Sequence, residues 1–284
     1  MEHDIAPQRR FDIGRILRRE PLTALAVLVL LAICFMAIFA PWLGTTDPIA
    51  LGTAPRMASP SAEHWFGADQ IGRDLYTRVL YGARVSLIVG IAVSVISIVI
   101  GLAIGLVSGA VRWLDGAIMR VMDGLMSIPS ILLAIALVAI IGGSLHTVII
   151  AITIVEFPRV ARMVRANVLS VREHLFVEAA VTVGSTMPQI IWRHILPNTV
   201  GLLVVQTAYI FAQAIMIEAG LSFIGAGVPP ETPSWGNIMA EGRVLWQVKP
   251  GIVLIPAAFL TMAVLAVNII GDSLRDALDP RQNH

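Results

Sequence analysis

The chain has 284 residues, of which 57% are hydrophobic and 14% charged, and its formal net charge is +1. Soluble domains carry about 25% charged residues, so this composition excludes a soluble protein and indicates an integral membrane protein. The single cysteine, Cys34, excludes an intrachain disulfide and a cysteine-based metal cluster.

Apolar segments of about 20 residues, the length of a membrane-spanning helix, recur along the chain. They lie at about 22–43, 86–107, 119–141, 144–164, 200–224 and 251–270. We therefore expect an all-α integral membrane protein with six transmembrane helices. Gly101 and Gly105 predict a close helix contact in the second segment. Glu156, Pro158 and Arg159 interrupt the end of the fourth, so a five-span alternative with this segment re-entrant stays open.

The placement of the basic residues predicts the orientation of these helices. Most of the arginines fall on the side that carries the amino terminus, which indicates that both termini are cytoplasmic. The expected divisions are a cytoplasmic tail (1–20), a first transmembrane helix (21–43), an extracytoplasmic segment (44–83), a core with five transmembrane helices (84–275) that contains a cytoplasmic loop (165–199), and a cytoplasmic tail (276–284).

The extracytoplasmic segment contains a run of turn-forming and charged residues. Gly67 and Gly72 permit turns, and Asp69, Arg73 and Asp74 can form ion pairs that hold these turns. Two interpretations stay open for this run. It is either a structural fold-back on the outer surface, or a contact with an extracytoplasmic partner or an outer gate.

Ionisable residues inside apolar segments are functional candidates. Asp123 is expected to pair with Arg120 or with an arginine of the next inner loop, and Pro129 is expected to kink the third helix. Glu218 lies well inside the fifth segment, where an unpaired carboxylate is unfavourable, so it must face protein or water. It is either hydrogen-bonded within the bundle or, with Ser222, part of a translocation path or gate.

The cytoplasmic loop, residues 165–199, is the longest polar interruption between the later apolar segments. Leu175, Ala179 and Val183 recur every four residues, which is typical of one face of a helix. Gly184 follows them and can adopt the left-handed conformation that ends a helix. The pattern therefore predicts a short helix that closes at this glycine.

A second helix is predicted directly after the glycine. Ser185 and Thr186 can cap its amino end, and Pro188 suits its first turn. Because proline disfavours helical backbone in the residue before it, Pro197 predicts that this helix ends at Leu196. A charged, kinked helix pair on the cytoplasmic side of a membrane protein indicates a docking surface for a soluble protein.

This stretch resembles the Glu-Ala-Ala (EAA) loop of bacterial ABC importer permeases, in which Glu-Ala-Ala, three residues, glycine and nine further residues precede Ile-x-Leu-Pro. The matching residues are Glu178, Ala179, Ala180, Gly184, Leu196 and Pro197. The isoleucine position of the pattern holds His194, and the run from Arg193 to Asn198 is similar to the dipeptide, oligopeptide and nickel subgroup.

Other stretches carry the same resemblance. The outer run is similar to a signature that follows the first span of C-type peptide permeases, with Ala68 in place of the usual threonine. Its matching residues are Phe66, Gly67, Asp69, Gly72, Arg73 and Asp74. The surroundings of Glu218 and the charged end at 271–281 also resemble this subgroup.

The resemblance implies the fold of an ABC importer permease with a cytoplasmic coupling-helix loop, in the bacterial inner membrane. It implies that this chain forms a translocation path for peptides with a second, homologous permease. It also implies two cytoplasmic ATPase subunits, which use ATP and Mg, and an extracytoplasmic substrate-binding protein. In that picture Glu178 orders or docks the loop, Ala179 and Ala180 allow close approach, and Gly184 sets the angle between the helices. Neither a catalytic residue nor a bound cofactor or nucleic acid is expected on this chain.

Competing functions leave recognisable sequence features. The only lysine, Lys249, is outside any Gly-Lys-Ser/Thr phosphate-binding loop, so this chain is not the ATPase, and the six histidines lack metal-site spacing. A secondary transporter, the main rival, would need paired inverted repeats with broken helices, and its uptake would not depend directly on ATP. Nickel and glutathione-like solutes stay open as alternatives to peptides.

Overall fold

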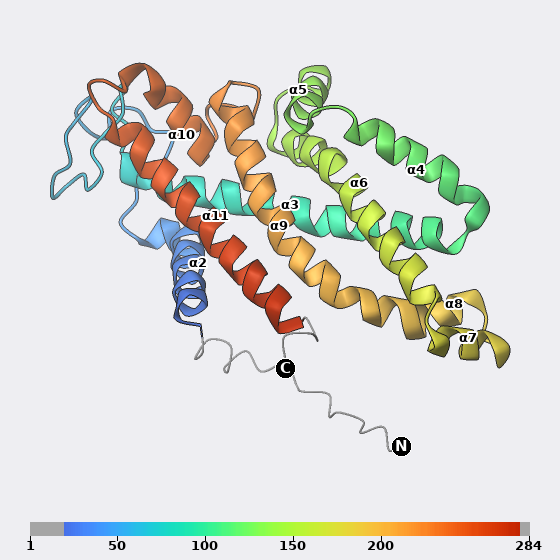
Figure 1. The fold of residues 1–284 in the computed structure, drawn as a ribbon. Helices are drawn as coiled ribbons and strands as arrows, with labels where there is room; N and C mark the ends of the chain where they lie inside the picture. Colours follow the sequence, from blue (N-terminus) through green and yellow to red (C-terminus); the bar gives the residue numbers. More distant parts are fainter. Residues whose placement is uncertain (1–19, 279–284) are drawn as a thin grey trace.

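The computed structural model describes residues 20–278, and their regular structure is helical (Figure 1). The elements are α2 (Pro21–Phe39), η1 (Ala40–Trp42), α3 (Leu75–Ala110), α4 (Arg112–Met126), α5 (Ser130–Ile141), α6 (Leu145–Arg172), α7 (Leu175–Thr182), α8 (Met187–Ile190), η2 (Ile191–Ile195), α9 (Leu196–Phe223), α10 (Trp235–Gly242), η3 (Arg243–Leu245) and α11 (Gly251–Leu278). The predicted cytoplasmic tails lie almost wholly outside the described residues.

The described helices have the length and composition of membrane spans. Four stretches are long and apolar enough to cross a bilayer, and a fifth is added if α4 and α5 count as one span. The four are Pro21–Trp42, Leu75–Ala110, Met187–Phe223 and Gly251–Leu278. The protein is therefore an all-helical membrane protein, as predicted. Helix α6, which contains the fourth predicted segment, is one uninterrupted helix of 28 residues but is not among these stretches, so the five-span alternative stays a prediction.

The closest helix packing joins α3 to α6. Glycines of α3 lie against valines of α6 at a four-residue spacing on both helices, in the pairs Gly101–Val160, Gly105–Val164 and Gly109–Val168. A Cβ atom added at Gly101 would lie 2.4 Å from the Cβ atom of Val160. Only residues without a side chain allow the two backbones to approach this closely, so the contact predicted at Gly101 and Gly105 is confirmed.

The predicted third span is broken rather than merely kinked. Helices α4 and α5 meet at 89° around Pro129, whose ring keeps the preceding residue out of helical conformation. The amino-terminal part, α4, begins at Arg112 and is tied to α6 by two ion pairs, Asp115–Arg165 and Asp123–Arg162. Asp123 therefore pairs with Arg162 of α6, which is one of the arginines predicted as its partners.

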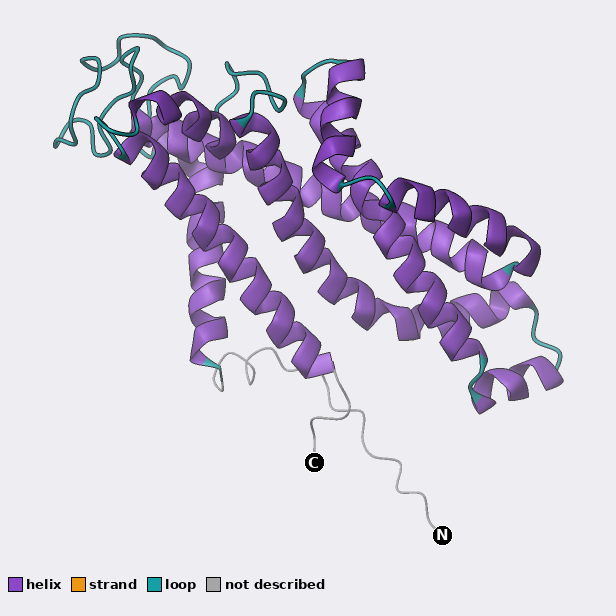
Figure 2. Ribbon diagram, turned by 45° about the horizontal axis from the view of Figure 1, so that its top comes forward, coloured by secondary structure: helices purple, strands orange, loops and turns teal. Residues whose placement is uncertain are grey.

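The two ends of the helix bundle look different (Figure 2). One end carries irregular chain, residues 44–74, together with α10, and we call these residues the cap. The opposite end carries α7 and α8, which we call the helix pair (Figure 1). The long helices α3 and α9 run between the two ends (Figure 1).

Candidate functional site

The predicted turn at Gly184 is present in the helix pair. Gly184 has a φ of +92°, and α7 ends in a Schellman motif. In this motif the Ser185 N–H donates to the Ala180 carbonyl at 3.0 Å, and the Gly184 N–H donates to the Val181 carbonyl at 2.9 Å. No atom lies within 4 Å of a Cβ atom built on Gly184. The position therefore needs glycine for its backbone conformation and not for space.

The second helix begins as predicted. Thr186 and Gln189 form a reciprocal capping box, in which the Thr186 N–H donates to the Gln189 side-chain oxygen at 2.8 Å. Pro188 lies in the first turn, where its missing N–H leaves no hydrogen bond unmade. The glycine at the end of α7 and the capping box at the start of α8 thus determine the bend between the two helices.

The predicted end of the second helix at Leu196 is wrong. The chain continues from α8 through a π-helical turn, η2, directly into α9. The wider turn accommodates Pro197, which cannot donate the usual backbone hydrogen bond. Two side chains form hydrogen bonds with the backbone carbonyl groups that precede it. The Asn198 amide donates to the His194 carbonyl at 2.6 Å, and the Thr199 hydroxyl donates to the Ile195 carbonyl at 2.8 Å.

The helix pair exposes large apolar side chains. Leu175 and Val183 are 81% and 87% exposed, whereas Val177 and Ile190 are buried and hold the pair against the bundle. Next to this surface lies a hollow of about 410 Å³. It is lined by Arg172, Val177, Glu178, Val181, Thr182, Met187 and Ile190. Contiguous exposed apolar surface beside charged groups is typical of a protein interface.

The EAA-type residues all lie on or next to this surface. Glu178, Ala179, Gly184 and Pro197 are exposed, and Ala180, His194 and Leu196 are half-buried. Sequence reasoning missed Phe176 and Trp192, which are also exposed. Phe176 lies between His174 and His194, with ring centroids at 5.4 and 5.8 Å, and so joins α7 to η2. The signal that could have indicated them is an aromatic residue in an otherwise polar loop.

The outer motif is the centre of the cap. The Asp69 carboxylate accepts hydrogen bonds from the backbone N–H groups of Ile71 and Arg73 and from the side chains of Arg73 and Arg78. Glu241 of α10 accepts hydrogen bonds from the same two arginines. The residues Asp69, Arg73, Arg78 and Glu241 form a buried charge cluster that ties the cap to α3 and α10. Arg78 and Glu241 are additions to the predicted motif.

The other motif residues shape the cap. Gly67 and Gly72 have φ values of +78° and +80°, as the predicted turns require. Asp74 does not pair with Arg73 as expected, because its carboxylate caps α3 by accepting the Thr77 N–H at 2.8 Å. Phe66 packs edge-on against Tyr76 and also contacts Phe259 of α11.

The charge cluster controls the ionisation of Asp69. Burial acts to raise the pKa of Asp69, but the hydrogen bonds and charge of Arg73 and the N–H of Ile71 outweigh it. Together they hold the pKa of this carboxyl below its usual range. The Asp69 carboxylate is therefore ionised in the folded cap at neutral pH.

Glu218 is fully buried at the end of α9 that lies under the cap. It accepts hydrogen bonds from Ser222 at 2.8 Å and from Ser86 of α3 at 3.4 Å, and the Ser234 hydroxyl faces the same carboxyl group. It thus touches α3, α9 and the amino end of α10. Glu218 and Ser222 lie far along α9 from the helix pair, so the predicted site residues form three separate groups.

Comparisons with known proteins support one family. A probable peptide ABC transporter permease from Sinorhizobium fredii is 51% identical over 95% of this chain and 92% of its own length. A dipeptide transport system permease from Alkalihalophilus pseudofirmus is 42% identical over 93% of this chain and 88% of its own length. A glutathione transport system permease from Salmonella typhimurium is also 42% identical, over 97% of this chain and 91% of its own length.

A solved structure and a family model agree with these relatives. The inward-facing methionine ABC transporter MetNI has a chain of similar fold, with a TM-score of 0.58 and 20% identity over 71% of this chain and 96% of that chain. Residues 97–284 match the model of the binding-protein-dependent transport system inner membrane component. This chain therefore belongs to that family as the inner-membrane permease of an ABC transporter, which works with a separate ATPase and a binding protein and is not the catalytic subunit.

Proposed function

We propose that this chain is a permease subunit of an ATP-driven importer of peptides. Relatives named as peptide and dipeptide permeases are 42–51% identical to it over nearly the whole chain. A permease named for glutathione, itself a small peptide, is 42% identical to the chain, as the dipeptide permease is. Glutathione-like solutes are therefore the second candidate, and nickel is the third.

We also propose six membrane spans with both termini in the cytoplasm. The spans are α2, α3, the bent pair α4–α5, α6, α9 and α11. Helix α6 is less apolar than the others because it carries four exposed or half-exposed arginines, but its 28 residues are long enough to cross a bilayer. The proposed divisions stay as predicted from the sequence: tails at 1–20 and 276–284, a first helix, an outer segment and a core.

The single observation that carries the mechanism is the exposed helix pair joined without interruption to α9. In the proposed complex one of two ATPase subunits docks on residues 165–199, and ATP and Mg are bound by those subunits. A second, homologous permease completes the translocation path. The binding protein docks on the cap side. Glu178 and the exposed apolar side chains would contact the ATPase, and the bend at Gly184 would fix their direction.

Transport follows from a two-state arrangement in this proposal. ATP binding closes the ATPase pair, and the docked helix pairs move with it. Because each helix pair is continuous with α9, the motion shifts α9 relative to its neighbours and exchanges an inward-facing for an outward-facing state. The two states are two arrangements of the same helices, and ATP shifts the equilibrium between them because it binds more tightly to one than to the other.

The substrate is tested by uptake in a deletion strain and the same strain complemented with this chain. The labelled panel contains di-, tri- and pentapeptides, glutathione and nickel, each with and without ATP depletion. We expect loss of ATP-dependent uptake of peptides only. Loss confined to nickel would overturn the peptide assignment, and uptake abolished by an uncoupler at constant ATP would indicate a secondary transporter.

The docking role is tested with Glu178→Lys and Gly184→Asp. We expect both variants to reach the membrane, to bind less ATPase in co-purification and to transport less substrate. Normal transport by both variants would exclude this role for the helix pair. Glu218→Gln is expected to lower transport with the complex intact if Glu218 belongs to the path or gate. Loss of protein abundance alone would assign it a structural role.

A further inference from the structure

One face of α9 is open along most of the helix and carries four polar side chains, with the apolar Leu202 and Met216 on the same face. Asn198, Gln206, Tyr209, Gln213 and Met216 lie within about 80° of one another around the helix axis, at 100° per residue. Asn198, Gln213 and Met216 are exposed, and Gln206 and Tyr209 are half-exposed. We call these five residues the polar stripe.

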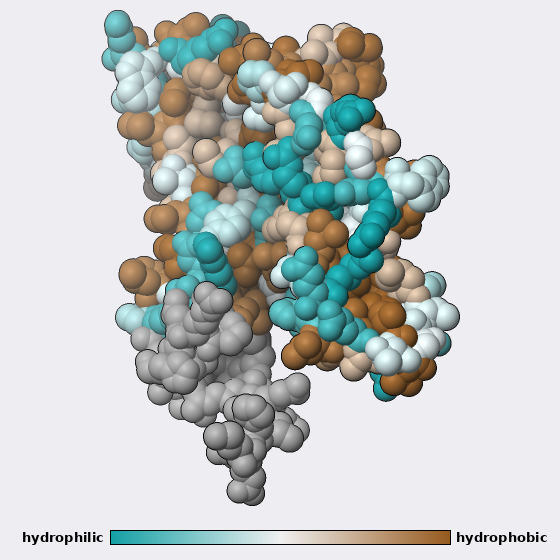
Figure 3. All heavy atoms as spheres, turned by 45° about the vertical axis from the view of Figure 1, so that its right-hand side comes forward, coloured by the Kyte–Doolittle hydropathy of each residue, from teal (hydrophilic) through white to brown (hydrophobic). Residues whose placement is uncertain are grey.

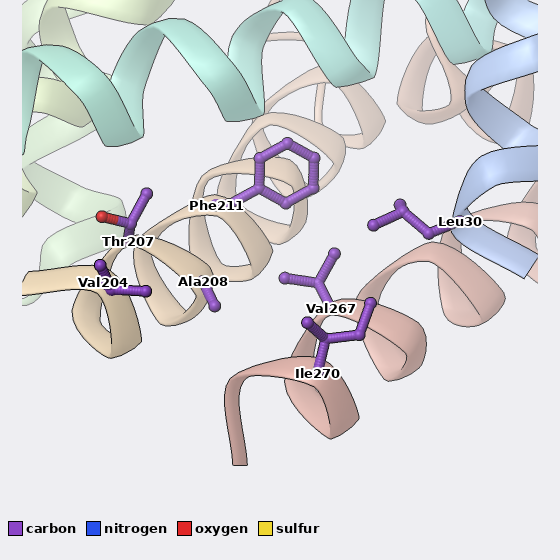
Figure 4. A pocket seen from close by; sticks show the side chains of 7 residues that line it. All are labelled: Leu30, Val204, Thr207, Ala208, Phe211, Val267 and Ile270. Atoms are coloured by element: carbon purple, nitrogen blue, oxygen red, sulfur yellow. The ribbon is translucent and has the colours of Figure 1, made fainter. Parts of the chain in front are cut away.

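The opposite side of α9 has a different character (Figure 4). There Val204, Ala208 and Phe211 line an apolar hollow of about 350 Å³, together with Leu30 of α2 and Val267 of α11. The hydroxyl of Thr207, which also lines it, donates to the Leu203 carbonyl at 2.7 Å and presents no free donor. The apolar side of α9 can lie against lipid or other apolar side chains, whereas the polar stripe cannot satisfy its hydrogen-bonding groups there.

Other spans expose apolar side chains where they are open. Helix α2 exposes Leu25, Leu28 and Leu31, and α3 exposes Ile91 and Val95. A glutamine has four hydrogen-bonding positions, and hydrocarbon satisfies none of them. Open glutamines on α9 therefore indicate water or a polar partner at the polar stripe, in contrast to the lipid expected at α2 and α3.

A charged residue of α11 adjoins the polar stripe. The Tyr209 hydroxyl donates to the carboxylate of Asp272, which is itself exposed. Asp272 belongs to the charged end of α11, where Arg275 also faces the Tyr209 hydroxyl, so water is expected at this end of the polar stripe. Figure 3 shows hydrophilic surface crossing an otherwise apolar face of the molecule.

We infer that the polar stripe, completed by Asp272, is the wall of the aqueous translocation path. This inference rests on the proposed importer function and names the residues that meet the substrate. The amides of Gln206 and Gln213 can donate to carbonyls and accept from N–H groups, which matches the peptide group whatever the side chains of the peptide.

The inference is tested by cysteine labelling in the assembled transporter in membrane vesicles. The starting variant is Cys34→Ala, which removes the only cysteine. Into it are placed Gln206→Cys, Gln213→Cys or the control Val95→Cys, a position on α3 that is 52% exposed. A charged, membrane-impermeant methanethiosulfonate is applied from either side. We expect labelling at least about tenfold faster at the two glutamine positions than at 95, slowed by a transported peptide.

Two results would overturn the inference. Labelling at 206 and 213 as slow as at 95 would place the polar stripe against protein or lipid, and fast labelling unaffected by a transported peptide would place it in water outside the path. Peptide uptake by Cys34→Ala vesicles is measured first. Absence of peptide uptake with the unmodified chain would overturn the proposed function instead, so the two failures are distinguishable.

Discussion

The cap and the helix pair are stabilised in opposite ways. In the cap, charged side chains are buried and matched, and glycines allow backbone segments to touch: a Cβ atom on Gly67 would lie 2.4 Å from the Ala58 carbonyl oxygen. In the helix pair, apolar side chains are open and the glycine at 184 has free space around it. The charged groups of the cap are paired with one another, although the buried Nε atom of Arg78 has no hydrogen-bond partner, whereas the helix pair leaves large apolar side chains open. This contrast supports the proposal that the cap is a structural region and the helix pair an interface.

The largest expected effect is on the charge cluster of the cap. Arg78→Ala would remove the more deeply buried of the two arginines that Asp69 and Glu241 share, and would leave only Arg73 to pair with both carboxylates. Removing one partner of a buried ion pair typically destabilises by about 3–5 kcal/mol. We expect a loss of that order in unfolding free energy, measured as thermal stability in detergent and as abundance in the membrane.

The matched control for this prediction is Arg84→Ala on the same helix. Arg84 is exposed and lies over the Tyr81 ring, so its removal should cost less than about 1 kcal/mol. Equal losses in the two variants would contradict a stabilising role specific to the charge cluster.

Gly67 of the cap and Gly184 of the helix pair have the same left-handed backbone conformation, so their substitution compares the two regions directly. Gly67→Ala and Gly184→Ala both place a side chain at positive φ, which destabilises by about 1–2 kcal/mol. Only at Gly67 does the new Cβ atom also collide with backbone, adding about 1–3 kcal/mol. We expect thermal unfolding to show the larger loss for Gly67→Ala. A larger loss for Gly184→Ala would mean that the helix pair is the more constrained region.

The exposed apolar residues of the helix pair are expected to affect binding and not stability. Leu175→Ser and Val183→Ser should change unfolding free energy by about 0.5 kcal/mol or less, because both side chains are open. Each should weaken ATPase binding by about tenfold, as for a side chain worth roughly 1.4 kcal/mol at an interface. Binding of the purified ATPase to permease in nanodiscs measures this change.

The control for the helix pair is Val177→Ser. Val177 is only 3% exposed, so this change should destabilise the fold itself. Unchanged ATPase affinity in both surface variants would assign the exposed surface to another partner.

The smallest expected effect is a pH dependence of the cap. The pKa of Asp69 is lower in the folded protein than in the unfolded chain, so its carboxylate contributes stability at neutral pH. This contribution is lost as the pH falls from about 4 through the lower, folded-state pKa. Asp69→Asn should therefore show a shallower fall in stability in that acid range than the unmodified chain. Identical acid unfolding curves would contradict the assignment.

The local features of the helix pair could be predicted from the sequence. The left-handed turn at Gly184, the cap at Thr186 and the place of Pro188 each depend on residues within four positions of one another. The end at Leu196 could not, because the rule for proline assumes an α-helix, and a π-helical turn with two side-chain hydrogen bonds removes the conflict.

Contacts between residues far apart in the chain could not be predicted from local sequence patterns. The pairing of Arg78 with Glu241 joins positions 163 residues apart, and nothing local distinguishes Glu241 from a solvated glutamate. The break at Pro129 was indicated by the proline, but its angle depends on the ion pairs that hold α4 along α6. The cap was therefore predicted as turns held by ion pairs among Asp69, Arg73 and Asp74, and its Asp69–Arg73 pair is confirmed, but the partners Arg78 and Glu241 were not predicted.

The continuous run from Met187 to Phe223 has a mechanical consequence. Its 37 residues extend about 55 Å if helical throughout, and no flexible loop absorbs motion along it. A tilt of about 5° at one end would therefore displace the other end by roughly 5 Å. A stiff helix of this length increases the displacement with distance from its attached end. A small rearrangement of an attached ATPase would therefore move the part of the helix near Glu218 by about the length of one peptide group.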